Sequence, residues 1–107
     1  PFHAPNWRGA FEALEDYGSA GTFGPYELHL TQDTSNPNPF HMDNFYGSEL
    51  EAYIDFDGAA GTVKFPNQTT GGKPITNSSG TYDQCEGTMH IKLNYDGGDW
   101  DYWFEKE

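Results

Sequence analysis

Two histidines and several carboxylates in the first half of the chain are the residues best suited to metal chemistry. His29 and His41 lie on opposite sides of a polar stretch, and Asp43 follows two residues after His41. If the flanking segments pair as antiparallel strands centred on Ser35, His29 stands opposite His41 and Glu27 stands opposite Asp43. Imidazole nitrogen and carboxylate oxygen are both good ligands for Zn²⁺ and similar ions. The pattern therefore raises the hypothesis of a divalent-metal site at His29, His41 and Asp43.

An ordinary solvated sheet face is the alternative to this metal site. The same pairing places Asp55 beside His41, and the next predicted hairpin places Lys64 beside Asp55. The Lys64 ammonium would then already neutralise one of the carboxylates that a metal ion needs. No cofactor is expected from the sequence.

Aromatic side chains supply a second set of candidates. Strand alternation places Tyr53 and Trp103 on the outward face, where flat rings can stack on a sugar or on another protein. Trp100 and Tyr102 point inward, where they would line a cavity for a small apolar molecule in a roomy barrel. The simpler interpretation is that Trp103 covers Lys92 and that the inward rings fill the core. The predicted ligand-binding residues are Trp103, Tyr53, Trp100 and Tyr102.

Catalytic patterns are missing from the sequence. No Ser, His and Asp arrangement stands out, and no nucleophile-elbow pattern surrounds Ser19 or Ser48. No phosphate-binding glycine loop precedes a helix. We therefore expect a protein that is not an enzyme.

Composition and charge exclude several classes of partner. The chain of 107 residues has a formal net charge of −12 and only five Lys or Arg residues. Nucleic acids and anionic membranes attract clustered basic residues, so neither is an expected partner. No apolar run is long enough to span a bilayer. The single cysteine, Cys85, allows no disulfide within the chain.

The elements that must position these residues are strands. Aromatic residues make up 17% of the chain and glycines number 13, a balance that favours strands and tight turns. Residues 89–95 and 100–104 alternate apolar with polar around a turn at Gly97-Gly98, which predicts the pairs Tyr95–Trp100, Leu93–Tyr102 and Ile91–Phe104. The same reasoning pairs Leu28 with Met42, Leu30 with Phe40, and Phe56 with Val63.

Successive hairpins of this kind predict one all-β domain over residues 1–107, an antiparallel up-and-down meander of about eight strands. Residues 7–17 could form a helix or a strand, and Gly9 favours the strand. Residues 1–6 and 67–79 are predicted to be loop-like, with at most one edge strand at Pro74–Thr76.

Short sequence motifs also carry a resemblance to a known group of proteins. They are Trp7-Arg8-Gly9-Ala10-Phe11, Asn44-Phe45-Tyr46-Gly47, the segment from Thr62 to Thr69, and Ser79-Gly80-Thr81-Tyr82. In these the chain resembles the small lipocalin-like (calycin-like) β-domains of secreted or surface lipoproteins in Bacteroidota. The resemblance implies a barrel or sandwich, and a secreted, periplasmic or cell-surface location with a targeting segment or lipid anchor outside this fragment.

Three functions follow as expectations. The first is a non-enzymatic binding module of a secreted or surface lipoprotein, with a glycan, a small apolar molecule or a protein as its ligand. The alternative is a structural or assembly domain of a larger cell-surface complex, and a divalent-metal-binding protein comes third. An exposed aromatic strip favours binding, whereas an apolar patch on an edge strand favours assembly.

Overall fold

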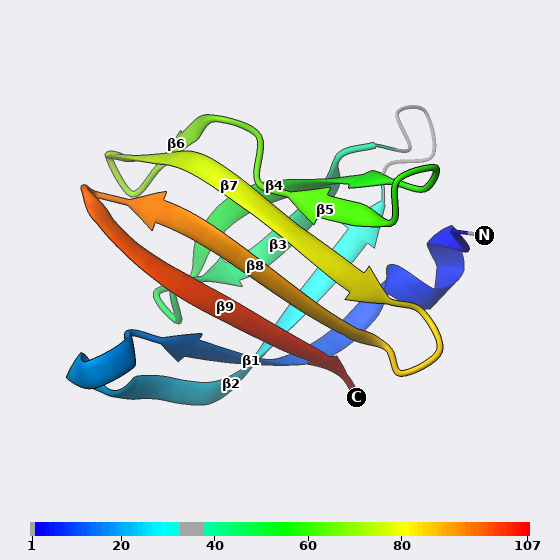
Figure 1. Cartoon of the computed structure of the whole chain (residues 1–107), viewed down its shortest axis with the longest axis horizontal. Coiled ribbons are helices and arrows are strands. Elements are labelled where there is room, and N and C mark those ends of the chain that lie inside the picture. The colour runs from blue at the N-terminus through cyan, green and yellow to red at the C-terminus, as the bar shows by residue number, and fades with distance from the viewer. Residues whose placement is uncertain (1, 33–37) are drawn as a thin grey trace.

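The computed structural model describes residues 2–32 and 38–107, and nearly all of its regular structure is β-strand (Figure 1). The strands are β1 (Gly9–Asp16), β2 (Thr22–Gln32), β3 (Phe40–Phe45), β4 (Leu50–Asp57), β5 (Thr62–Lys64), β6 (Gln68–Thr70), β7 (Lys73–Asp83), β8 (Thr88–Tyr95) and β9 (Gly98–Lys106). Two single-turn 3-10 helices cover Ala4–Trp7 and Gly18–Ala20. Within the described ranges, no helix has the length and apolarity that crossing a membrane requires.

The strands form one antiparallel sheet that closes on itself. Their order is β5-β4-β3-β2-β1-β9-β8-β7-β6, and a further pairing between Thr62 of β5 and Thr81 of β7 completes the closure. Eight strands make the barrel, and the short β6 pairs only with β7. The predicted all-β, up-and-down, lipocalin-like fold is therefore confirmed, and of the two expected forms, barrel and sandwich, the chain adopts the barrel.

The barrel interior is filled mainly by aromatic rings. Tyr102 is fully buried, and its ring centroid lies 4.4 Å from that of Phe104 and 4.9 Å from that of Trp100. Phe45 packs edge-on against Phe65 at 5.5 Å and against Tyr95 at 5.0 Å. Tilted and edge-to-face pairs of this kind are the favoured arrangements of aromatic rings. The large apolar area per ring lets a short chain with few aliphatic residues build a core.

The N-terminal segment plugs one end of the barrel. Of residues 7–17, Gly9–Asp16 form the strand β1, as the glycine suggested, and the predicted loop at 1–6 contains part of the 3-10 helix Ala4–Trp7. Trp7 is fully buried, with its ring stacked on Phe11 and edge-on to Tyr82. Phe2 adds a contact to Phe56. We call this the plugged end of the barrel.

The C-terminal hairpin has a different register from the predicted one. Leu93 pairs with Trp100 and Ile91 with Tyr102, because the two turn residues are Asp96 and Gly97. Both have positive φ, 54° and 83°, as a two-residue hairpin turn requires. When the turn shifts by one residue along the chain, the cross-strand partner of each residue shifts by two. Because side chains alternate with a period of two, every side chain still points to the face of the sheet that was predicted.

The β2–β3 hairpin is shifted by two residues in the same way. Leu30 pairs with Met42, and His41 stands opposite Thr31 rather than His29. Both registers bury the same apolar residues, so alternation alone could not separate them. The predicted loop centre at Ser35 lies outside the described residues.

The β4–β5 hairpin was predicted correctly, with Asp55 opposite Lys64 and Phe56 opposite Val63.

The prediction of a loop over 67–79 is wrong, because most of this segment is strand. It contributes β6 and more than half of β7. Ile75 is the one buried apolar residue of β7, so the strand has almost no apolar alternation. Its ladder to β8 holds it in place, aided by the Ser78 hydroxyl, which accepts a 2.9 Å hydrogen bond from the Phe65 amide.

Candidate functional site

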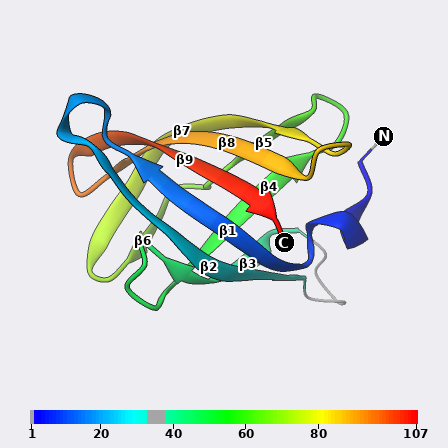
Figure 2. The ribbon, with the colours of Figure 1, turned by 90° about the horizontal axis from the view of Figure 1, so that it is seen from below.

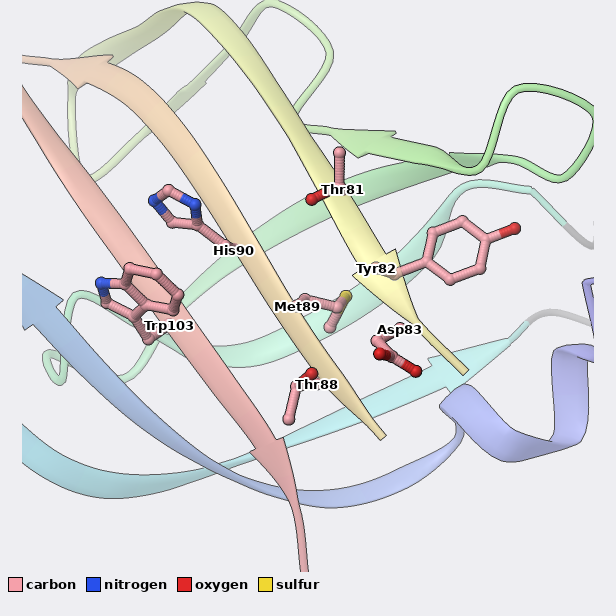
Figure 3. Close-up of a pocket in the computed structure, with 7 residues that line it drawn as sticks. All are labelled: Thr81, Tyr82, Asp83, Thr88, Met89, His90 and Trp103. Carbon is pink, nitrogen blue, oxygen red and sulfur yellow. The ribbon is translucent and has the colours of Figure 1, made fainter. Parts of the chain in front are cut away.

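Trp103 presents a fixed aromatic surface on the outside of the barrel. Its side chain projects outward from β9 and is 45% exposed. The imidazole of His90, on the neighbouring β8, lies parallel to the indole, with ring centroids 3.8 Å apart and an angle of 4° (Figure 3). The two residues are direct partners in the β8–β9 ladder. The predicted partner of Trp103, Lys92, instead stands opposite Asp101.

Asp101 helps to hold this stack. Its Oδ1 lies 2.8 Å from His90 Nε2, within hydrogen-bonding distance. The imidazole lies on one face of the indole, and Leu14 of β1 is the partner of Trp103 on its other side in the ladder. A ring that is already fixed loses little conformational entropy when a ligand stacks on it.

Two shallow depressions flank the indole. One, of about 400 Å³, lies over β7, β8 and β9 (Figure 3). The other, of about 320 Å³, lies toward β1. Their polar lining residues are Thr81, Asp83, Thr88, His90, Glu12 and Glu105. Among the described residues that line them there is no Lys or Arg. We call this surface the Trp103 face.

Tyr53 does not belong to the Trp103 face. It is also 45% exposed, but it lies on β4, where it stands opposite His41 of β3. Three strands separate β4 from β9 in the sheet. The structure thus confirms that both rings are exposed, as alternation indicated, and places them on different sides of the barrel.

The proposed metal ligands are not brought together as predicted. His29 Nδ1 lies 3.0 Å from Asp43 Oδ2, and His41 Nε2 lies 2.8 Å from Glu51 Oε1. Asp55 stands opposite Lys64, and the residue opposite His41 on β4 is Tyr53. His29 Nε2 also lies 3.3 Å from Glu27 Oε2, so the two imidazoles contact different carboxylates. In the part of the chain that the structure describes, no group of three or more His, Cys, Asp or Glu side chains is arranged to hold a metal ion.

Trp100 and Tyr102 are buried near the end of the barrel that lies opposite the plugged end. A separate hollow lies above them there. Figure 2 shows the β1–β2 connection at the opposite end from the N-terminal segment. The hollow there has a volume of about 330 Å³ and is lined by Glu15, Tyr17, Phe23, Tyr46 and Ser48. Trp100 packs against the rings of Tyr17 and Tyr46, at 5.3 and 5.8 Å. We call this site the open-end hollow.

Glu15 is the most unusual residue of the open-end hollow, because it is a carboxylate that is only 1% exposed. The hydroxyls of Tyr17 and Tyr26 each donate a hydrogen bond to one of its oxygens. Tyr26 also shares a hydrogen bond with the Tyr102 hydroxyl, which accepts one from the Tyr46 amide at 3.2 Å. A buried charge is tolerated only when such donors surround it.

A β-bulge brings these groups together. The β1–β2 ladder shifts by one residue between the pairs Ala13–Tyr26 and Glu15–Phe23. Two residues of β2, Gly24 and Pro25, then oppose a single residue of β1. Bulges of this type redirect side chains. Here Phe23 and Tyr26 come within 5.7 Å of each other, ring to ring, beside Glu15.

The electrostatics of the cluster follow from its burial. Burial raises the pKa of Glu15 above its ordinary value, and the hydrogen bonds from Tyr17 and Tyr26 partly oppose that rise. Burial also raises the pKa of each of these two tyrosines and of Tyr102. The three hydroxyls therefore remain neutral donors while Glu15 titrates.

Sequence reasoning missed Glu15, although a signal was present. Phe11, Ala13 and Glu15 occupy alternate positions, so a strand that points Phe11 inward also points Glu15 inward. A charged residue at an inward position is a recognisable exception to the pattern.

Comparison of the chain with protein-family models, with curated proteins and with solved structures finds no match.

Proposed function

We propose that this protein is a non-enzymatic binding module that holds a neutral carbohydrate on the Trp103 face. One observation carries the proposal: the indole of Trp103 is half exposed, yet it is held in place by the parallel imidazole of His90. The His90 stack fixes the Trp103 ring before a ligand arrives, which lowers the entropy cost of binding.

The surroundings of the ring favour a sugar over an apolar molecule. The C–H face of a pyranose packs on an aromatic ring, while its hydroxyls need hydrogen-bonding partners at the rim. Thr81, Thr88 and Asp83 supply such partners on one side of Trp103, and Glu12 and Glu105 supply them on the other. The same carboxylates, on a chain of net charge −12, disfavour anionic polysaccharides.

The fold supports binding over strand-mediated assembly. The sheet closes through β5 and β7, so the barrel strands offer little free edge to a further strand. The resemblance to secreted Bacteroidota lipoproteins supports a secreted, periplasmic or cell-surface setting. In that setting the carbohydrate-binding module, either free or as part of a lipid-anchored protein, would meet polysaccharides.

Affinity electrophoresis and calorimetry with soluble xylan, mixed-linkage β-glucan and polygalacturonate test this proposal. We expect binding to at least one neutral polysaccharide, and a loss of at least about ten-fold in affinity for Trp103→Ala, which corresponds to about 1.4 kcal/mol. Tyr53→Ala is the matched control, because Tyr53 is equally exposed on another side of the barrel.

Two results would overturn the carbohydrate proposal. The first is that the native chain binds none of the neutral polysaccharides. The second is that Trp103→Ala, with an unchanged far-UV circular dichroism spectrum, binds as tightly as the native chain. Equal losses in Trp103→Ala and Tyr53→Ala would also count against a specific site.

A further inference from the structure

The two ends of the barrel are built differently. The plugged end is filled by Trp7 and Phe2, which pack on the core rings. At the opposite end, the open-end hollow leaves the rings of Phe23 and Tyr46 53% and 36% exposed above a buried carboxylate. Burial of these rings would stabilise the fold, so their exposure calls for an explanation.

The buried carboxylate has no cation among its described partners. Tyr17 and Tyr26 donate hydrogen bonds to Glu15, but neither carries a charge. The described residues that line the hollow include no Lys, Arg or His. A carboxylate has about four lone-pair positions, so the two hydroxyls leave acceptor capacity unused. The Glu15 carboxylate thus gives the hollow a negative potential. Because the surrounding protein has a low dielectric constant, this potential attracts a cation more strongly than it would in water.

Aromatic rings complete the site. Tyr17, Phe23 and Tyr46 line the hollow together with Glu15. Tyr46 also packs on Tyr95 at 5.0 Å and on Trp100 at 5.8 Å, which fixes its ring. Ring faces attract organic cations, and cages of such rings recognise ammonium groups that carry alkyl substituents. We propose that the open-end hollow binds a small organic ammonium ion, with Glu15 as its counter-ion and Tyr17, Phe23 and Tyr46 as its aromatic walls.

The dimensions and rigidity of the hollow limit the ligand. About 330 Å³ is at the small end of ligand pockets, so a head group of a few carbons fits and a long chain does not. Gly47 lies against the wall: a Cβ there would come within 2.8 Å of the Phe23 ring. Its φ of +62° also disfavours any other residue. This close approach holds Phe23 in position.

Calorimetry and ¹H–¹⁵N NMR titration with tetramethylammonium and choline test the ammonium site. The neutral carbon analogue of choline, 3,3-dimethylbutan-1-ol, serves as the uncharged probe. We expect both cations to bind with dissociation constants below about 10 mM, and the alcohol to bind at least about ten-fold more weakly, because it lacks the charge that Glu15 and the rings attract. The largest shifts are expected at Tyr17, Tyr46 and Gly47.

Variants distinguish the counter-ion from the walls. Glu15→Gln should lose at least about ten-fold in affinity for tetramethylammonium. Glu86→Gln, at an exposed position in the turn between β7 and β8, is the matched control and should bind as the native chain does. Phe23→Ala and Tyr46→Ala test the walls, and because the Tyr46 ring also packs on the core residues Tyr95 and Trp100, far-UV circular dichroism checks that Tyr46→Ala is folded.

Several outcomes would overturn this proposal. They are equal binding of the alcohol and the cations, unchanged affinity in a folded Glu15→Gln, or unchanged affinity in both Phe23→Ala and Tyr46→Ala. Absence of tetramethylammonium and choline binding up to about 10 mM would do so as well. Failure of the Trp103→Ala test does not bear on this site, because the two sites share no lining residue.

Discussion

The Glu15 carboxylate is buried at the open end of the barrel, where it pairs in register with Phe23 of β2 and Tyr102 of β9. Removing a carboxylate from water is unfavourable, and two tyrosine hydroxyls offset only part of that effect. The raised pKa of Glu15 follows from this balance, because the folded chain binds the proton of this carboxyl group more tightly than the unfolded chain does. Ionisation of this carboxyl group therefore lowers the stability of the folded chain.

The first stability prediction concerns Glu15→Gln. The folded-state pKa of Glu15 lies above its ordinary value of 4.5, so its full contribution to stability is present below pH 4.5 and is lost as pH rises through the folded pKa. Glutamine is neutral at every pH. We expect Glu15→Gln to be more stable than the native chain at pH 7, because ionisation of the carboxyl group is less favourable in the folded chain than in the unfolded one.

Urea unfolding between pH 3.5 and pH 8 measures this gain. It should shrink toward zero as pH falls below 4.5, because both side chains are then neutral. The groups that face Glu15 are Tyr17, Tyr26 and Tyr102, whose pKa values are all raised, so they do not titrate in this range. A gain that stays constant with pH would contradict the assignment of the effect to the Glu15 charge.

At the scale of the elements, the β8–β9 hairpin depends on which two residues form its turn. Asp96 and Gly97 both have positive φ, whereas Gly98 is the first residue of β9 and pairs with Tyr95. Gly97→Ala should destabilise the chain by about 1 kcal/mol, because alanine is strained at a φ of 83°. Gly98→Ala should change stability little, since the nearest atom to its added Cβ lies 3.8 Å away.

Thermal unfolding of the two glycine variants measures this difference. A larger loss of stability in Gly98→Ala than in Gly97→Ala would instead favour a turn at Gly97-Gly98, with Tyr95 opposite Trp100. The comparison is well matched, because both changes add one methyl group at adjacent positions.

The strands illustrate what the sequence could and could not predict. Apolar alternation in β4, β8 and β9 predicted both the strands and the faces on which Trp103 and Tyr53 lie. It could not choose between registers two residues apart, so it wrongly placed His29 opposite His41. Alternation also failed for β7, where hydrogen bonds rather than apolar burial define the strand.

At the scale of the whole molecule, barrel closure determines where function can lie. The interior is filled with rings and one end is plugged, which leaves the outer wall and the open end as the surfaces available to ligands. The Trp103 face could be anticipated from alternation. The open-end hollow could not, because it depends on a bulge at Gly24-Pro25 and on residues that are far apart in the sequence.

Carbohydrate binding at the Trp103 face is the central claim, and the tryptophan indole N–H resonances test it most directly. The chain has three tryptophans, of which Trp7 and Trp100 are buried and Trp103 is exposed. Titration of ¹⁵N-labelled protein with xylan or β-glucan oligosaccharides should shift or broaden the Trp103 resonance and leave that of Trp7 unchanged. A saturable shift at other sites with an unmoved Trp103 resonance, or no shift anywhere at millimolar oligosaccharide, would contradict it.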